Sequence, residues 1–308
     1  MRPTPPTDRR PHGLTLVELL VVVAMIGVLA ALALPALARA LARGQVTRCT
    51  NNQYQVAFAL LRHDERHGEI PGWLNDSPNG SPLACSWPVP LLPFLARSDI
   101  YDMWPALPNN PLIDTLVCPS NRPARSLGYP PSHYAGNAGA GGTDADDGVF
   151  TNRFKATGRG AQLDVIAEAD GTSTTLAFAE KAALGFQPHA WNYAPAVAPQ
   201  GSPFGSGPSL PPIFGAGAPP GPRYPVINDA AARAYAPASV HDGGVVVAFC
   251  DGHTAFLSAK LQPYEYGQLL TSKSRWQGTT NKTNSPAMQP WLLRAGQRYL
   301  LDETILRP

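Results

Sequence analysis

Residues 13–38, GLTLVELLVVVAMIGVLAALALPALA, decide the architecture of this 308-residue chain. Glu18 is the only charged residue in the stretch, and the 19 residues from 19 to 37 carry no charge at all. At a rise of about 1.5 Å per residue, such a helix comes close to the ~30 Å hydrocarbon thickness of a bilayer. The stretch therefore predicts a single membrane-spanning helix.

The flanking charges predict how this helix is oriented. Arg9 and Arg10 lie a few residues before the apolar run, so the positive-inside rule places the preceding residues in the cytoplasm and the head in the periplasm or outside the cell. A secretory signal peptide would have a shorter apolar run, followed by a cleavage site between small residues. A plain signal anchor leaves Glu18 without a role, because a carboxylate inside a membrane costs several kcal/mol.

The string GLTLVELL, residues 13–20, followed by the apolar helix, resembles the N-terminus of type IV prepilins and pseudopilins. In that family a prepilin peptidase cuts after the glycine and methylates the new N-terminus. The resemblance therefore implies cleavage and methylation between Gly13 and Leu14, although most members have Phe where this chain has Leu14. It also implies an inner-membrane assembly machinery and other pilin-like subunits as partners.

Two residues of the stretch are expected to govern assembly. Cleavage frees a charged amine, which Glu18 of a neighbouring helix can neutralise, so that two charges that are costly alone form a pair. Pro35 removes one backbone hydrogen bond and is expected to kink or locally melt the helix. The leader is then residues 1–13, the membrane part 14–38 and the periplasmic part of the helix 39–67.

Residues 68–308 are expected to form an α+β head, in which the long N-terminal helix packs on a mainly antiparallel β-sheet. The helix should end near His67 and Gly68, since Pro71 follows as a stop signal. Residues 195–225 hold ten Pro and six Gly and predict an irregular surface loop. Strands are predicted over residues 175–178, 244–250 and 254–257, an extended or short helical segment over 86–95 and a short helix over 290–302.

The sequence HDGGVVVAFCDGHTAFLS, residues 241–258, predicts a β-hairpin. Two β-rich runs flank Asp251-Gly252, a dipeptide typical of type I′ turns. Nine residues separate His241 from Asp251, and this spacing resembles the prepilin-processing-associated His-x(9)-Asp-Gly family of pilin-like proteins, which contains a domain of unknown function. The resemblance extends to residues 48–52, 118–120, 134–137, 147–150 and 170–175, with Glu180.

Four cysteines, all beyond the membrane span, lie in the predicted oxidising compartment, where disulfides form. They allow three pairings, between which the sequence does not decide. The absence of a Cys-x-x-Cys pair argues against a zinc knuckle. The candidates are Cys49, Cys85, Cys118 and Cys250.

No cofactor is expected, and calcium is the one metal with candidate ligands of note. Asp144, Asp146 and Asp147 resemble the start of an EF-hand loop, but Gly148 stands at a ligand position and the downstream glutamate is missing. A solvated acidic turn is therefore preferred. His63 and His67 stand four residues apart, and a polar helix end is preferred to a metal pair there.

Composition and motifs narrow the range of possible functions. Lys and Arg (24) nearly balance Asp and Glu (22), which argues against a dedicated nucleic-acid binder. No nucleophile elbow or phosphate loop appears, so the sequence supports no enzyme. A pilin-like structural subunit for secretion or a surface filament is preferred. The alternative is a signal-anchored surface receptor that binds a glycan or another solute through exposed tryptophans, namely Trp73, Trp87, Trp104 and Trp191.

Overall fold

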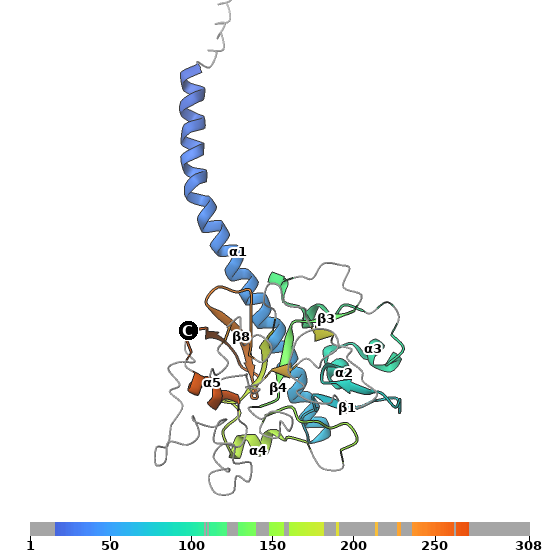
Figure 1. Cartoon of the computed structure of the whole chain (residues 1–308). Coiled ribbons are helices and arrows are strands. Elements are labelled where there is room, and N and C mark those ends of the chain that lie inside the picture. Colours follow the sequence, from blue (N-terminus) through green and yellow to red (C-terminus); the bar gives the residue numbers. More distant parts are fainter. Residues whose placement is uncertain are drawn as a thin grey trace, which may run out of the picture. The chain divides into compact units, whose positions relative to one another are not determined.

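The computed structural model (Figure 1) describes residues 16–107, 109, 111–121, 129–139, 148–156, 160–181, 189–190, 213–214, 227–228, 236–261 and 263–270. The chain divides into two compact units, Met1–Gly44 and Gln45–Pro308. The first contains the apolar part of the long helix. The second contains the remainder of that helix and the head.

Helix α1 runs from Leu16 to His67 and ends where the sequence predicts. It continues through Pro35 as an unbroken α-helix, so the local melting is not seen, and the alternative of a kink at Pro35 stays a prediction. A proline removes only one backbone hydrogen bond, and the surrounding Leu and Ala residues are strong helix formers. At the other end, Gly68 has a φ of +71° and donates its N–H to the Asp64 carbonyl at 2.7 Å, which closes the last turn.

Burial along α1 changes at Cys49. Every residue from 16 to 45 is exposed, and this part is the one described helix long and apolar enough to cross a membrane. From Cys49 onward one face of the helix is buried, at the three- and four-residue spacing that keeps side chains on one face. The buried residues on this face include Cys49, Gln53, Val56, Leu60 and His63.

The head is built on a mixed but mainly antiparallel five-stranded sheet, in the order β7-β4-β5-β8-β9. Only the β4–β7 pair is parallel. This confirms the predicted α+β class, with a long N-terminal helix on a mainly antiparallel sheet. The strands are β4 (Tyr134–Asn137), β5 (Leu176–Glu180), β7 (Ile213–Phe214), β8 (Gly244–Phe249) and β9 (Thr254–Ser258).

Smaller elements surround the sheet. Two further two-stranded sheets pair β1 with β2 and β3 with β6. These strands are β1 (Leu74–Asp76), β2 (Ala84–Ser86), β3 (Pro131–Ser132) and β6 (His189–Ala190). The short helices are α2 (Pro88–Leu91), η1 (Leu92–Leu95), α3 (Ser98–Met103), η2 (Asp114–Leu116), η3 (Pro119–Asn121), α4 (Leu163–Glu168) and α5 (Pro263–Leu270).

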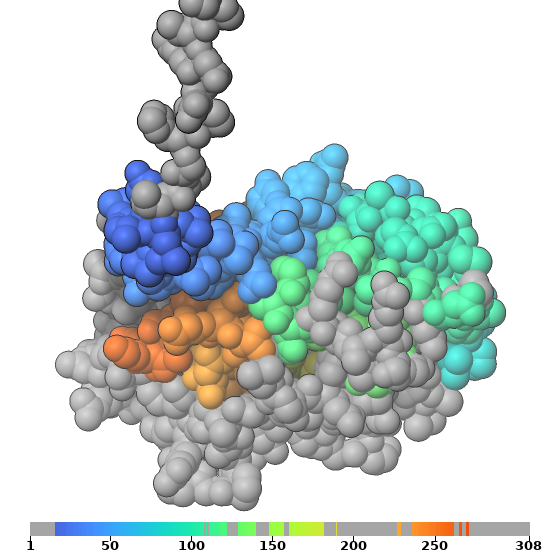
Figure 2. All heavy atoms as spheres, turned by 90° about the horizontal axis from the view of Figure 1, so that it is seen from above, coloured from blue at the N-terminus to red at the C-terminus, as the bar shows by residue number. Residues whose placement is uncertain are grey.

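Strand β8 is buried on both faces and therefore joins two hydrophobic clusters. Ala248 contributes to the cluster that contains the buried face of α1, whereas Val247 and Phe249 contribute to the cluster that contains α5. This alternation explains why residues 244–250 form an almost continuous apolar run rather than an apolar–polar pattern. Figure 2 shows the hairpin strands, in orange, lying against the light-blue part of α1.

Two local expectations need correction. Strands β8 and β9 form the predicted hairpin, but Asp251 is not among the residues with positive φ, so the turn is not type I′. Only Gly252, at a φ of +91°, has that conformation, because Ala248 pairs with Thr254 and leaves a longer loop. Within the stretch predicted to be irregular, β7 pairs with β4.

Candidate functional site

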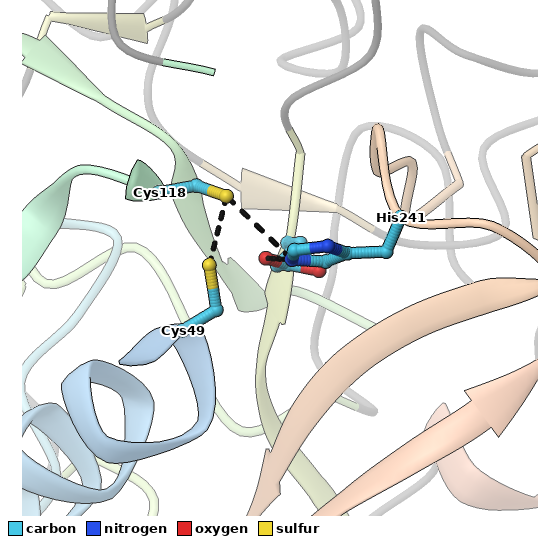
Figure 3. A group of neighbouring side chains, drawn as sticks. Cys49, Cys118 and His241 are labelled. Atoms are coloured by element: carbon cyan, nitrogen blue, oxygen red, sulfur yellow. Dashed lines mark hydrogen bonds and ion pairs between the residues drawn. The ribbon is translucent and has the colours of Figure 1, made fainter. Parts of the chain in front are cut away.

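Four polar side chains from four separate segments meet inside the head. Cys49 lies on α1, Cys118 follows η2, Glu180 ends β5 and His241 precedes β8. Their sulfur, oxygen and nitrogen atoms all lie within 4.8 Å of one another, and all four residues are buried. Figure 3 shows the labelled Cys49, Cys118 and His241 side chains converging on one point. We call these four residues the Cys-Glu-His cluster.

The distances within the cluster define its contacts. The two sulfurs of Cys49 and Cys118 are 2.8 Å apart, and the Cys118 sulfur is 3.7 Å from His241 Nε2. The same Nε2 lies 3.2 Å from Glu180 Oε1. One ring nitrogen thus faces both the sulfur and the carboxylate. A nucleophile–histidine–acid relay would use one nitrogen for each partner, so the cluster does not have this arrangement.

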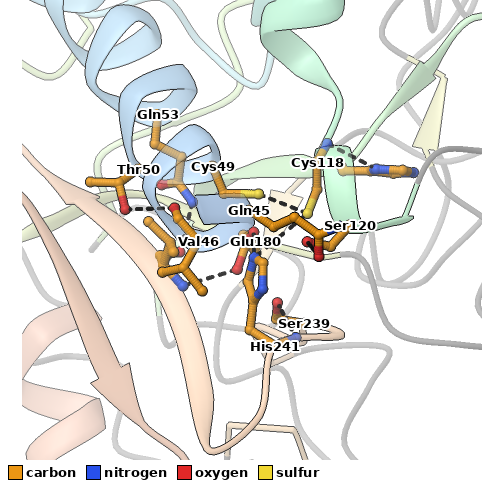
Figure 4. A network of polar contacts seen from close by, with 12 residues as sticks. Gln45, Val46, Cys49, Thr50, Gln53, Cys118, Ser120, Glu180, Ser239 and His241 are labelled. Atoms are coloured by element: carbon orange, nitrogen blue, oxygen red, sulfur yellow. Dashed lines mark hydrogen bonds and ion pairs between the residues drawn. The ribbon is translucent and has the colours of Figure 1, made fainter. Parts of the chain in front are cut away.

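Neighbouring groups hold the cluster in place (Figure 4). The Val246 N–H donates to Glu180 Oε2 at 2.9 Å, and the Gln53 side-chain amide donates to the Val246 carbonyl at 2.7 Å. The Cys118 N–H donates to His133 Nδ1 at 3.1 Å. Strand β8 therefore contacts both the carboxylate of the cluster and the buried face of α1 through one residue.

The electrostatics of the reduced cluster favour a charged His241. Burial alone lowers the pKa of His241, but hydrogen bonds to Cys118 and Glu180 and the negative charges of both raise it to about 10. Burial alone raises the pKa of Glu180, yet the hydrogen bond and charge of His241 and the Val246 N–H bring it below its ordinary value. The pair is therefore an imidazolium and a carboxylate near neutral pH.

The two thiols differ in acidity because one hydrogen bond joins them, with Cys49 as its donor and Cys118 as its acceptor. The hydrogen bond from Cys49 lowers the pKa of Cys118 most, burial opposes it, and the hydrogen bond from His241 lowers it further, to about 6. Donating that hydrogen bond, together with burial, raises the pKa of Cys49 far above its ordinary value. The reduced cluster thus holds one thiolate, at Cys118, and one thiol, at Cys49.

The donor atoms and the distances between them can be compared with two kinds of site, a zinc site and a disulfide-forming cysteine pair. Two thiolates, an imidazole and a carboxylate are ligands that zinc accepts, but Zn–S bonds of about 2.3 Å place two sulfurs of a tetrahedral site roughly 3.8 Å apart. The observed 2.8 Å between the sulfurs is about 1 Å shorter than this. A covalent bond between the sulfurs requires a smaller change, to about 2.05 Å. The contact therefore fits a cysteine pair better than a zinc site.

The nine-residue spacing of the His-x(9)-Asp-Gly motif corresponds to the length of β8 and its turn. Val246 clusters with Cys49 and Cys118 at one end, and a Cβ on Gly252 would lie 2.9 Å from Leu61 Cδ1 at the other. Twelve helical residues from Cys49 to Leu61 span about 18 Å. The six residues after Val246, three in strand β8 and three in the turn, reach at most about 20 Å. The motif thus contacts two places on α1.

The remaining predicted site residues do not join the cluster. Glu18 and Pro35 lie on the exposed part of α1. Cys85 and Cys250 are buried in the hydrophobic core, and the Cys85 thiol donates to the Asp76 carbonyl at 3.4 Å. Outside the described residues lie Gly13, Leu14, Asp144, Asp146, Asp147, Trp191 and the helix predicted over residues 290–302.

Two other groups have structural surroundings. The rings of His63 and His67 pack at a tilt of 35°, with centroids 4.2 Å apart, and their Nδ1 atoms contact the carbonyls of Glu69 and His63 at 3.0 Å. Burial, together with the charge of His67, lowers the pKa of His63 to about 4. Both rings therefore pack at the helix end. Three of the four tryptophans proposed for binding, Trp73, Trp87 and Trp104, are at most 5% exposed.

Sequence reasoning did not predict that Glu180 and His241 meet the cysteines. Glu180 appeared only as part of a family-like segment, and the two residues are 61 positions apart in the sequence. The one available signal was the isolated acidic residue at the end of an apolar strand, LAFAE, where a buried carboxylate needs a partner.

Two family models together match most of the chain. The family model described as "Protein of unknown function (DUF1559)" matches residues 38–263, and the "Prokaryotic N-terminal methylation motif" matches residues 8–34. The second match confirms the resemblance drawn from residues 13–20. No curated protein and no solved structure matches the chain.

Proposed function

The chain belongs to the family described as "Protein of unknown function (DUF1559)", and we propose that it is a pilin-like structural subunit rather than an enzyme. In this proposal a prepilin peptidase removes residues 1–13 and methylates Leu14. The processed subunit then assembles through α1 with other pilin-like subunits, into a type II secretion pseudopilus or a type IV pilus-like filament.

One observation carries the proposal: a prepilin-type methylation motif leads into a helix whose apolar side chains have no cover. The motif covers residues 8–34, and the side chains of Leu16, Leu29 and Leu32 are 78%, 67% and 72% exposed. Apolar surface of this extent is unfavourable in water, so it requires a bilayer or neighbouring helices. A pilin-like subunit uses both in turn, first the membrane and then the filament.

The charges around the helix support the proposed topology. Arg9 and Arg10 favour a cytoplasmic location for the leader, which places the head in the periplasm or on the cell surface. Glu18, in the first turns of α1, supplies the carboxylate for the freed amine of a neighbouring subunit. The inner-membrane assembly machinery would then extract processed subunits from the bilayer.

The signal-anchored receptor has less support, because it needs exposed aromatic side chains on the head. The buried Trp73, Trp87 and Trp104 belong to the hydrophobic core. Burying their rings stabilises the head but leaves no aromatic platform for a solute among these three residues.

Alanine substitutions at two glycines, Gly13 at the expected cut and Gly44 in α1, provide a matched test of processing. Gly13→Ala should block removal of the leader, because the resemblance places the cut after this residue. Gly44→Ala should leave processing unchanged, since a Cβ at Gly44 meets no atom within 4 Å. Migration of both variants on gels of host membranes measures the cut. Equal processing of the two variants would contradict the proposal.

Assembly is tested separately from processing. Glu18→Ala should be processed normally but lost from cross-linked oligomers and from sheared surface fractions. Glu65→Ala is the control, because it removes a carboxylate from the other end of the same helix, where Glu65 makes an exposed pair with Arg62 at 3.0 Å. A receptor would retain its surface level in both variants, and that result would favour the signal-anchored alternative.

A further inference from the structure

The sulfur contact in the Cys-Glu-His cluster lies where α1 enters the head. Cys49 is the first buried residue of the helix, and Cys118 comes from a separate segment 69 positions later. Any pull along α1, during extraction from the membrane or within a filament, reaches Cys49 before any other buried residue of the helix, just after the exposed hydrogen bond between Gln45 and Ser120. A link here would bear that load before the apolar contacts of Val56 and Leu60 do.

We propose that Cys49 and Cys118 form a disulfide bond that fastens α1 to the head at this point, while Cys85 and Cys250 remain thiols. We call this bond the helix clamp. The inference rests on the proposed function for its compartment, because an exported head lies where disulfides form and persist.

Geometry distinguishes this pair from the other five combinations of cysteines. The Cys49 and Cys118 sulfurs are 2.8 Å apart, well inside the contact distance of two non-bonded sulfurs. Among the described residues, neither Cys85 nor Cys250 has a sulfur contact with another cysteine, and Cys85 donates to a backbone carbonyl instead. Both of these side chains are fully buried in the hydrophobic core.

Charge balance points the same way. The reduced cluster contains the Cys118 thiolate, the Glu180 carboxylate and a single cation, His241, so one negative charge is buried without compensation. Forming the bond removes the thiolate. What remains is the Glu180–His241 pair at 3.2 Å, in which one imidazolium balances one carboxylate. The residue that opens the His-x(9)-Asp-Gly motif thus completes the neutral surroundings of the clamp.

The bond forms by thiol–disulfide exchange with a protein disulfide of an oxidase in the same compartment. The Cys118 thiolate attacks one sulfur of the oxidant disulfide, giving a mixed disulfide and releasing one oxidant thiolate. Cys49 then gives its proton to the released oxidant thiolate, attacks the Cys118 sulfur and releases the second oxidant thiolate. Two electrons pass from the cysteines to the oxidant. Both cysteines are fully buried in the folded head, so exchange occurs while the head folds.

Thiol counting on the full chain tests the clamp. Membranes of the host are quenched in acid, the protein is denatured, free thiols are labelled with N-ethylmaleimide, and the tryptic peptides are identified by mass spectrometry. We expect two labels, on Cys85 and Cys250, and one cross-linked peptide pair joining Cys49 to Cys118. A Cys85→Ser/Cys250→Ser variant should carry no label, whereas Cys49→Ser/Cys118→Ser should carry two.

A second readout separates a clamp from a mere sulfur contact. In detergent, dithiothreitol should lower the melting temperature of the wild type and of Cys85→Ser/Cys250→Ser, but not that of Cys49→Ser/Cys118→Ser. The reduced wild type should recover the same cross-link when it is refolded with oxidised glutathione.

The outcomes separate failure of the clamp from failure of the proposed function. Four labels both in the host and after refolding, a Cys85–Cys250 cross-link, or one zinc per chain with four labels would each overturn the clamp. Four labels in the host, followed by closure of the Cys49–Cys118 bond in vitro, would support the pairing but contradict export of the head. Four labels under both conditions on a chain that starts at methylated Leu14 would leave the proposed function standing and the clamp refuted.

Discussion

Replacing Gly252 by Ala tests whether the turn of the β8–β9 hairpin presses on α1. Gly252 has a φ of +91°, and a Cβ there would lie 2.9 Å from Leu61 Cδ1 on the helix. A left-handed backbone costs a non-glycine residue about 1–2 kcal/mol. Displacing the half-buried Leu61 side chain adds about 1 kcal/mol more, at the low end of the cost of overpacking.

Gly243 provides a matched control for the backbone strain. Its φ is +82°, close to that of Gly252, but a Cβ on Gly243 meets nothing within 4 Å. Gly243→Ala should therefore lower the free energy of unfolding through backbone strain alone. Gly252→Ala should lower it through the same strain and, in addition, through displacement of the Leu61 side chain. At about 2–4 °C per kcal/mol, Gly252→Ala should melt roughly 2–4 °C below Gly243→Ala.

The assay is thermal unfolding of the detergent-solubilised full chain, followed by tryptophan fluorescence. A double variant, Gly252→Ala with Leu61→Ala, removes the displaced side chain, so the difference from the Leu61→Ala variant should shrink to the strain alone. Equal melting temperatures for Gly252→Ala and Gly243→Ala would refute the contact between the turn and α1. The account of the nine-residue spacing would fail with it.

Other predictions concern the cluster and the core. In the reduced chain, the raised pKa of His241 gives stability that is complete below about pH 6.5 and is lost as the pH rises towards 10. The lowered pKa of Glu180 gives stability that is present above about pH 4.5 and is lost in acid. The lowered pKa of Cys118 adds stability as the pH rises from about 6 to 9 and offsets the His241 loss over that window. Melting temperatures from pH 4 to 10 should therefore be highest between about pH 6.5 and 9 and fall on both sides, and a profile that is flat across the whole range would contradict the ion pair. Glu180→Gln should leave the His241 charge without its carboxylate, cost about 3–5 kcal/mol and reduce the alkaline loss; an unchanged alkaline limb would show that another group titrates there. Trp87→Ala, in contact with Phe178 at a centroid distance of 4.8 Å, should cost about 3–5 kcal/mol in the same melts, and a cost below about 1 kcal/mol would contradict its place in the core.

The sequence predicted the long elements well because their signals are local. The end of α1 at His67 followed from periodicity, with Gly68 and Pro71 behind it, and the β8–β9 hairpin followed from two apolar runs around a turn. The turn type was wrong because tertiary pairing sets the register, and Ala248 paired with Thr254 leaves a longer loop than the dipeptide alone predicts.

The cluster itself could not be predicted, because its members are distant in the chain. Cys49 and Cys118 were two of four equivalent candidates, and nothing in their spacing ranks one pairing above another. Only the fold brings the end of β5, with Glu180, beside the loop that carries His241. Strand β7 escaped prediction for a related reason, since its two residues gain their order from parallel pairing with β4 rather than from their own pattern.

The N-terminus of the protein in the native host tests the central claim most directly. The N-terminal peptide from the membrane fraction is identified by mass spectrometry. Processing as a pilin-like subunit predicts a chain that starts at Leu14 with one added methyl group on its amine. A chain that keeps the arginines of the leader would contradict this account and favour a signal-anchored surface protein, and a cut after Leu37 would indicate a released head.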